Sequence, residues 1–352
     1  MGDLKQLIAA TGFEIFNVLP VSPSKTFFHF KNWLQAGNQA QMHWLARPDA
    51  VDKRADLRKI MPNAQSVLVL GFRYTPPAIP QNLLNDPARG IIARYALYDD
   101  YHQILKQKLK LIVVSLKQSL GDFSDKIYVD TGPILERELA VYANLGFIGR
   151  HSNLIHRQLG SYLFLAEIIT SVKKENFLFF EKKLTVSQNN ACQLCHKCQT
   201  NCPTQAIVDN KIIDARKCIS YLTIEHQGVI PSALRPLLKN RIYGCDLCQE
   251  VCPYNQTAQA QKAVVKNDFT QHPDLVAPLL ESLLFFQEEE FKEKFKNSPI
   301  LRAKREGLMR NVAVALGNWH HPRARILLKQ ILRKDPSLLV RTHAQWGLMR
   351  QY

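Results

Sequence analysis

The chain has 352 residues, with 46 Lys and Arg against 30 Asp and Glu, a formal net charge of +16 and a pI near 9.5. This length suffices to bury a core without disulfide staples, and no apolar run approaches the ~20 residues of a membrane span. The opening MGDLKQLIAATGF shows no basic region followed by an apolar one, so we expect a cytoplasmic protein without a secretory signal or membrane attachment.

The first half of the chain alternates between helical and strand patterns. Apolar residues at helical spacing and terminal glycines predict the helices, and runs rich in Val, Ile and Leu predict the strands. In chain order these are a helix at 2–12, a strand at 66–74, a helix at 99–120, a strand at 126–130, a helix at 134–146 and a strand at 160–170. The alternation predicts an α/β (α+β) domain with a central sheet covered by helices. Neither a G-x-G-x-x-G fingerprint nor a Walker A run is present in the sequence.

The stretch YVDTGPILER contains a carboxylate at the end of a predicted strand. In one interpretation Asp130 or Thr131 caps the following helix, with Pro133 in its first turn and Glu136 placed favourably for the helix dipole. From the residues alone this interpretation is favoured, because caps are far commoner than catalytic acids. In the other, Asp130 faces a substrate at the edge of the sheet, and desolvation raises its pKa so that it delivers a proton near neutral pH.

The stretch ACQLCHKCQTNCPTQAI (191–207) carries four cysteines in the pattern C-x2-C-x2-C-x3-C-P. A second set ends in the same way, as C-x2-C-x3-C-P, with 26 residues between its first cysteine and this ending. This spacing is typical of bacterial ferredoxins with two [4Fe–4S] clusters, in which the fourth cysteine of each run ligates the other cluster. Structural zinc is the alternative, although it would leave the third thiol of the first run without a clear role. The crossed assignment gives one cluster Cys192, Cys195, Cys198 and Cys252, and the other Cys202, Cys218, Cys245 and Cys248.

The C-terminal segment 302–352 is strongly basic, with eleven Lys and Arg and two acids. Helical patterns at 310–319, 324–335 and 339–350 resemble the paired helices of a HEAT repeat. The charge favours a polyanion such as nucleic acid over a merely solvated face or an anionic membrane surface. Arg325, Lys329 and Arg333 recur at helical spacing and are predicted to contact phosphates from one face.

Several ordered motifs resemble the epoxyqueuosine reductases, which are cobalamin-dependent iron–sulfur enzymes of tRNA modification. The motifs are VDTGPILER, GSYLFLAEIIT, ACQLCHKCQTNCPTQAI, RKCISYLT and NRIYGCDLCQEVCPYN, and the resemblance continues through the HEAT-like tail. It implies reduction of epoxyqueuosine to queuosine at the wobble position of a tRNA anticodon stem-loop. It also implies a corrinoid-binding domain similar to that of reductive dehalogenases (1–185), a ferredoxin-like domain with two clusters (186–260) and a basic helical tRNA-binding domain (261–352).

The resemblance also implies roles for individual residues. Asp130 becomes the catalytic acid, which reverses the preference for a helix cap. Lys239 and Arg241, close to the second cluster in sequence, are predicted to hold tRNA phosphates. Electrons come from an external low-potential donor, and the protein is expected to be a monomer. The predicted cobalamin contacts are Arg54, Ala93, Asp130, Leu154, Leu165, Ser220 and Asp246.

Two other functions stay open at this point. A corrinoid reductive dehalogenase would use the same chemistry, but would not need a basic tail. A ferredoxin-like electron carrier without catalysis would bind no cobalamin. The string from Asp100 to Leu105 lacks the glycine of the cobalamin motif D-x-H-x-x-G, so His102 is not predicted to ligate cobalt. We expect His102 to pack or form a bond at the start of its helix.

Overall fold

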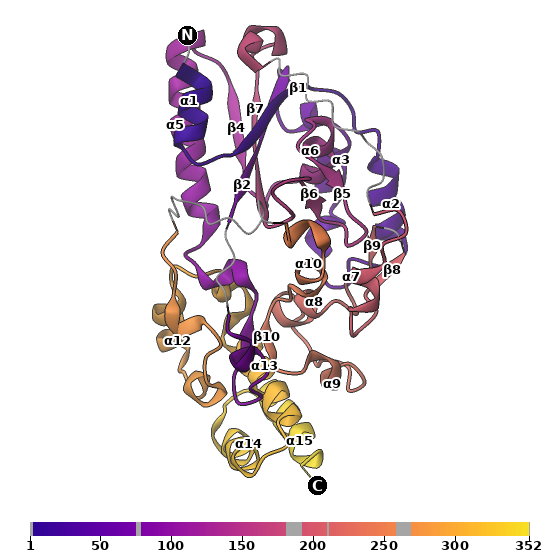
Figure 1. Cartoon of the computed structure of the whole chain (residues 1–352), viewed down its shortest axis with the longest axis vertical. Coiled ribbons are helices and arrows are strands. Elements are labelled where there is room, and N and C mark those ends of the chain that lie inside the picture. The colour runs from indigo at the N-terminus through magenta and orange to yellow at the C-terminus, as the bar shows by residue number, and fades with distance from the viewer. Residues whose placement is uncertain (1–2, 75–78, 181–191, 210, 258–268, 352) are drawn as a thin grey trace.

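A computed structural model describes residues 3–74, 79–180, 192–209, 211–257 and 269–351 (Figure 1). Its central feature is a four-stranded sheet in the order β1-β2-β7-β4. The strands are β1 (Ile15–Pro20), β2 (Ser66–Arg73), β7 (Leu163–Thr170) and β4 (Asp125–Tyr128). All three pairings are antiparallel, with Val69 and Tyr128 both opposite Glu167. The three predicted strands are confirmed with shifted ends, whereas β1 was not predicted.

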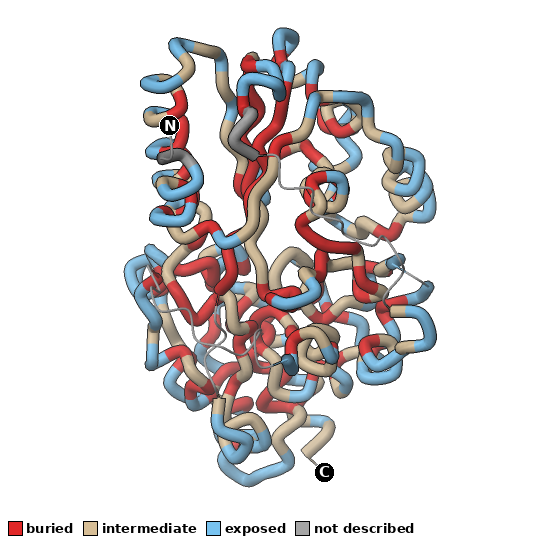
Figure 2. The backbone as a smooth tube through the Cα atoms, turned by 45° about the horizontal axis from the view of Figure 1, so that its top comes forward, coloured by how far each residue is buried: buried red, intermediate tan, exposed pale blue. Residues whose placement is uncertain are grey.

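Helices cover both faces of this sheet, as predicted. On one face α1 (Asp3–Ala10) and α5 (Tyr101–Leu120) pack against β2 and β7 through Leu68, Leu105 and Ile168 (Figure 1). On the other face α3 (Pro48–Ala55) and α6 (Glu136–Tyr142) border a second apolar cluster that contains Val67 and Ala140. Because both faces are covered, every residue of β2 is buried, and Figure 2 shows burial concentrated along the central strands. Further short elements of this half are α2 (Phe27–Gln35), β5 (Phe147–Ile148) and β6 (Leu154–Ile155), and α4 (Gln81–Leu84), which lies toward the cysteine-rich part.

The cysteine-rich segment consists of short elements that pack below the sheet in Figure 1. The elements are α7 (Lys197–Thr200), β8 (Ile207–Asp209), β9 (Ile212–Ile213), α8 (Ile219–Ile224), α9 (Arg235–Leu238), β10 (Arg241–Tyr243) and α10 (Leu247–Glu250). Strand β10 pairs in parallel with β3 (Ile91–Ile92), which comes from the N-terminal half. The two parts of the chain therefore share a small sheet.

The C-terminal part is helical, with α12 (Glu288–Phe295), α13 (Lys304–Asn318), α14 (Pro322–Lys334) and α15 (Leu338–Met349). The three helical patterns of the basic tail are thus confirmed. Helix α13 is largely buried, and its Arg310 donates hydrogen bonds to the backbone carbonyls of Leu222, His226 and Gly228. These bonds attach the helical part to the cysteine-rich part.

One apolar core runs through all three predicted domains, from Ile8 in α1 to Ala344 in α15. The three parts are therefore packed as one body, and the domain boundaries at 185 and 260 stay predictions. Within the described residues, none of the helices combines the length and apolarity that crossing a membrane requires.

Candidate active site

Asp130 lies in a tight turn just beyond β4. Its φ of 57° is in the left-handed region, which is uncommon for residues other than glycine and marks local strain. Helix α6 begins only at Glu136, after Leu135, which contributes no side-chain cap. The capping interpretation of Asp130 and Thr131 is therefore wrong. The strained turn instead presents a carboxylate with 61% of its side-chain surface exposed.

Two side chains from the start of α5 meet the Asp130 carboxylate. The Tyr101 hydroxyl donates to Asp130 Oδ2 at 2.6 Å, and His102 Nε2 lies 3.5 Å from the same oxygen. Asp100 caps the helix by accepting the His102 backbone N–H, and its carboxylate also contacts His102 Nδ1 at 2.7 Å. His102 thus forms a bond at the start of its helix, as predicted, and it lies between two carboxylates.

The direction of the Asp130 pKa differs from the sequence prediction. Desolvation would raise the Asp130 pKa, but the nearby His102 ring and the hydrogen bond from Tyr101 outweigh this and hold the pKa below its usual value. Burial would lower the pKa of His102, but Asp100 and Asp130 together raise it to about 9. At neutral pH this arrangement holds an Asp130 carboxylate against a protonated His102.

Two further carboxyl groups lie on the other side of Asp130. Glu167 is fully buried at the centre of β7, and Glu136 opens α6 beside it. Burial raises the pKa of Glu136 to about 8, and the Asp130 charge raises it further in the same direction. Burial also raises the pKa of Glu167 well above its usual value. We refer to Tyr101, His102, Asp130, Glu136 and Glu167 as the acid cluster.

The eight cysteines are all free thiols, and several of them pack close together. Cys252 packs against Cys192, and Cys218 lies in the same apolar cluster as Cys245. Burial raises the pKa of Cys198 to about 11 and that of Cys245 to about 12, and neighbouring thiols add to both shifts. Among the described residues, no three His, Cys, Asp or Glu side chains converge closely enough to chelate a single metal ion.

The neighbours that raise each thiol pKa separate the cysteines into two groups. Cys192 and Cys195 act on Cys198 and also on Cys252, whereas Cys202 acts on Cys218. Cys245 and Cys218 act on Cys248, and Cys198 adds a smaller effect across the two sets. We refer to Cys192, Cys195, Cys198 and Cys252 as the first cysteine group, and to Cys202, Cys218, Cys245 and Cys248 as the second.

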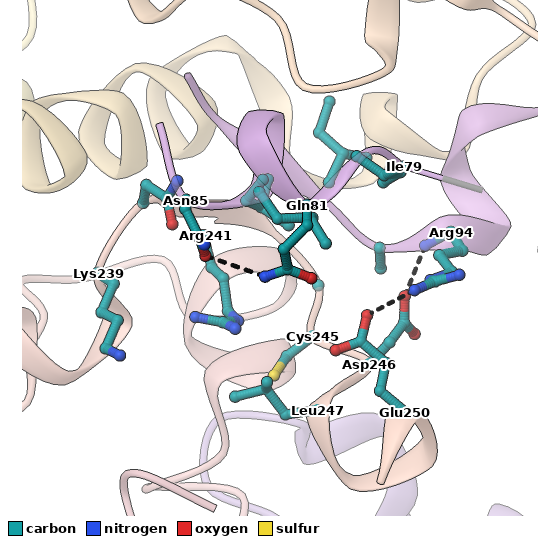
Figure 3. A pocket seen from close by; sticks show the side chains of 16 residues that line it. Ile79, Gln81, Asn85, Arg94, Lys239, Arg241, Cys245, Asp246, Leu247 and Glu250 are labelled. Atoms are coloured by element: carbon teal, nitrogen blue, oxygen red, sulfur yellow. Dashed lines mark hydrogen bonds and ion pairs between the residues drawn. The ribbon is translucent and has the colours of Figure 1, made fainter. Parts of the chain in front are cut away.

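A cavity of about 240 Å³ opens beside the second cysteine group (Figure 3). Cys245 lines it, as do four of the predicted site residues: Ala93, Asp246, Lys239 and Arg241. Asp246 is buried and accepts the backbone N–H of Arg94 at 2.7 Å. Burial raises the pKa of Asp246 to about 6.

A run of tyrosine rings joins the cavity to the acid cluster. Tyr243, two residues before Cys245, lies 6.3 Å from the ring of Tyr95, which in turn lies 6.1 Å from the ring of Tyr101. Gly244 has a φ of +69°, and a Cβ atom there would come within 2.4 Å of the Ala93 Cβ. Only glycine therefore allows the Cys245 loop to approach Ala93 this closely.

The other predicted site residues lie elsewhere. Arg54 is buried in α3, where it donates to the Ala50 carbonyl and lines a separate cavity. Leu154 and Leu165 belong to the apolar cluster between the sheet and α6, and Ser220 is on α8 beside the second cysteine group. On α14, Lys329 and Arg333 are exposed and Arg325 is half-buried.

Comparison with known proteins gives this geometry a context. A family model described as "Epoxyqueuosine reductase QueG, DUF1730" matches residues 54–131, and one described as "4Fe-4S double cluster binding domain" matches residues 191–255. The epoxyqueuosine reductase of Xanthomonas campestris is 36% identical over 98% of this chain and 94% of its own length, and that of Escherichia coli is 36% identical over 99% and 88%. The chain belongs to the epoxyqueuosine reductase family. It is accordingly an oxidoreductase with a 4Fe–4S double-cluster domain.

Solved structures of the family match the whole fold. One, an epoxyqueuosine reductase with an epoxyqueuosine-modified tRNA-Tyr stem loop, has a TM-score of 0.84 at 27% identity and covers 99% of this chain and 89% of its own. Another is the epoxyqueuosine reductase of Bacillus subtilis, in a structure whose catalytic aspartate loop is swung out of the active site. It has a TM-score of 0.85 at 27% identity and covers 99% of this chain and 89% of its own.

Sequence reasoning did not foresee most of the acid cluster. Tyr101 was not singled out, Glu136 was considered only for its helix position, and Glu167 was not noticed. One signal was available, because an acid in the middle of LFLAEIIT interrupts an otherwise apolar central strand.

Proposed function

We propose that the protein reduces epoxyqueuosine to queuosine at the wobble position of tRNA. The observation that carries this proposal is similarity over almost the whole chain to epoxyqueuosine reductases, one of them solved with the modified tRNA stem loop. The reaction consumes two electrons and two protons and releases the epoxide oxygen as water. Side chains supply no low-potential electrons, so they must come through cofactors.

The cavity beside Cys245 suits the cobalamin that the sequence resemblance implies. A cofactor with many amide groups needs backbone and polar partners. The lining of this cavity offers Ala93, the loop at Gly244, Asp246, and the cationic side chains of Lys239 and Arg241. We propose that Ala93, Asp246 and the neighbouring Ser220 hold the corrinoid. Its reduced cobalt, when bound, supplies a strongly nucleophilic source of electrons. For Arg54, Leu154 and Leu165 a corrinoid contact stays a sequence prediction.

The two cysteine groups would hold the clusters that supply electrons to that cavity. Cys245 of the second group lines the cavity itself, so a cluster held by that group would lie next to it. The external low-potential donor would then serve the cluster of the first group. We assign the ligands as the crossed groups described above.

Asp130 is the proposed proton donor to the departing oxygen. Its carboxylate is ionised in this arrangement, so it must draw the proton from a neighbour before it can donate. His102 is the proposed source, because it is protonated at neutral pH and lies 3.5 Å away. Tyr101 is nearer, but burial raises its pKa well above the usual value, so it holds its proton. The strained backbone at Asp130 suits a residue that moves during the reaction.

The tRNA must present its modified base to this cavity while its backbone rests on basic residues. Lys239 and Arg241 line the cavity, and Lys329 and Arg333 are exposed on α14. An unpaired anticodon loop is suitable, because its bases can be splayed out into a pocket.

Anaerobic reconstitution with iron, sulfide and cobalamin, followed by assay on tRNA that carries epoxyqueuosine, tests the proposal. We expect conversion to queuosine that depends on cobalamin and on a chemical reductant. Retention of both clusters without any cobalamin binding would instead identify an electron carrier.

A further inference from the structure

Helix α13 belongs to the basic helical part, which the sequence predicts to bind tRNA, yet most of its residues are buried. We propose that Asn311 on this helix is a positioning residue of the second cysteine group, with Arg310 as its support. Together they hold the segment that carries Cys218 beside the segment that carries Cys245. The inference rests on the cluster that the proposed function assigns to the second group, but on no step of the reaction.

The two segments are far apart in the sequence. Between Cys218 and Cys245 lie 26 residues, whereas neighbouring cysteines of the first run are separated by two or three. Short spacing fixes the thiols of such a run locally, but a connection of this length leaves its ends free to separate and costs entropy to close. Other contacts must therefore bring Cys218 to Cys245 and Cys248.

A single side-chain amide on α13 bonds to both segments. Asn311 Nδ2 donates to the backbone carbonyls of Thr223 and Ile242, both at 2.8 Å. Thr223 belongs to α8, which begins directly after Cys218. Ile242 is in β10, three residues before Cys245. An amide nitrogen carries two hydrogens, so each of the two segments receives one of them.

Arg310 fixes the direction in which this amide faces. Its guanidinium can only donate, and both Nε and Nη2 donate to Asn311 Oδ1, at 3.1 and 2.9 Å. The amide nitrogen must therefore face the two carbonyls. The other bonds of Arg310 go to the carbonyls of Leu222, His226 and Gly228, in or just after α8. Both side chains are 0% exposed, so water cannot replace a bond that is lost.

Among the described hydrogen bonds, one joins the two segments directly. The Gly244 backbone N–H donates to the Thr223 hydroxyl at 2.9 Å, and that hydroxyl donates to the Ile219 carbonyl at 2.7 Å. Gly244 is the residue before Cys245. Ile219 is the residue after Cys218, so one hydroxyl connects the backbone beside both proposed ligands. The bridge from α13 thus acts on the same two ends of the 26-residue connection.

A second asparagine on the same helix provides a matched control. Asn318 Nδ2 also donates to two backbone carbonyls, those of Arg235 and Lys239, both at 2.9 Å. Neither carbonyl belongs to α8 or β10, the elements beside the cysteines. Asn311→Asp and Asn318→Asp each replace an amide that donates twice by a carboxylate that cannot donate. They remove equal numbers of bonds, but only the first removes the bridge.

Loss of iron to a chelator tests the positioning without cobalamin, tRNA or turnover. The full chain, reconstituted anaerobically with iron and sulfide, should hold about eight iron atoms. In Asn311→Asp, about four of them should be lost at least tenfold faster, because substitution of groups that orient metal ligands typically weakens metal binding by 10–100-fold. The rest should leave at the wild-type rate, as should all the iron of Asn318→Asp. Combination of Asn311→Asp with Cys202→Ala, which should keep only the first group's cluster, should abolish the fast phase.

Thermal unfolding separates positioning from stability. Both aspartate variants should lower Tm, because each removes two hydrogen bonds. A lower Tm in Asn311→Asp with iron loss at the wild-type rate would overturn the proposal, and so would equal acceleration of all the iron. If Asn311→Asp does not fold, Asn311→Ser, which is smaller and keeps one donor, should show the same fast phase.

The same measurements distinguish this inference from the proposed function. A wild type that holds only about four iron atoms would overturn the proposed second cluster, and the positioning role with it. A wild type that holds both clusters but leaves epoxyqueuosine in tRNA unreduced would overturn the proposed reaction and leave the positioning role intact.

Discussion

The contact between His102 and Asp130 differs from the two cysteine groups in how neighbouring charges act. His102 and Asp130 compensate each other, since His102 is kept protonated by the same Asp130 that it keeps ionised. Among the cysteines, burial and adjacent thiols act together, and both raise the pKa, as at Cys198 and Cys245. Thiolates at these sites need positive charge from iron. The first region is thus stable as protein alone, whereas the second depends on its metal, and substitutions in the two should have different consequences.

The largest effects are expected among the cysteines. Cys202→Ala should remove the cluster of Cys218, Cys245 and Cys248 and spare the other, which leaves about four of eight iron atoms per chain. The mirror variant Cys252→Ala should remove the cluster of the first group instead. Iron and acid-labile sulfide analysis with electron paramagnetic resonance of each variant measures this. If Cys202→Ala removes the first group's cluster, the crossed assignment is wrong.

Substitution of Asp130 should slow turnover strongly but leave the cysteine groups intact. Asp130→Asn keeps the shape but carries no transferable proton, so the rate should fall by about 10²–10⁴. Cluster content and cobalamin binding should match wild type, since no cysteine contacts this turn among the described interactions. Near-normal turnover of epoxyqueuosine tRNA would mean that Asp130 does not donate the proton.

Replacement of His102 should have a smaller effect with a distinct dependence on pH. Because its pKa is raised to about 9 in the folded state, His102 adds stability that is present below its unfolded value near 6.5 and is lost as pH rises through 9. His102→Gln should lower the free energy of unfolding at pH 6 by about 2–3 kcal/mol, and Tm with it. At pH 10 the same substitution should have little effect. Differential scanning calorimetry at the two pH values measures the contrast, and an equal loss at both would show that the His102 charge contributes nothing.

The mildest effect concerns the basic helix α14. Reversal of Arg325, Lys329 and Arg333 to Glu should raise KM for tRNA and flatten the slope of affinity against salt by about one unit per lost phosphate contact. Cobalamin and iron content should not change. A control that reverses Lys59, Lys110 and Lys126, all exposed on the sheet part, changes net charge equally. Equal effects of the two triple variants would indicate a general charge effect without contact at α14.

The sequence predicted the cysteine region better than the acid cluster, and the reason is physical. Cluster ligands lie on short loops, so their spacing in sequence reflects their spacing in space. The acid cluster joins α5, the turn after β4, α6 and β7, and its contacts depend on sheet order. The alternating pattern predicted a covered sheet but not that every pairing is antiparallel, because helix and strand patterns do not encode strand direction. For Asp130, its place at the end of a strand was visible in the sequence, whereas its contacts with Tyr101 and His102 were not.

The pairing of β3 with β10 sets an order of events during synthesis. Ile91 hydrogen-bonds across a parallel ladder whose other strand begins at Arg241, 150 positions later in the chain. At ~5–20 residues per second, the ribosome needs roughly 8–30 seconds to supply that partner. Until then the N-terminal half has an open edge and no wall for the cavity beside Cys245. The wall of this cavity and the full set of eight cysteines can therefore come together only after translation has passed Cys252.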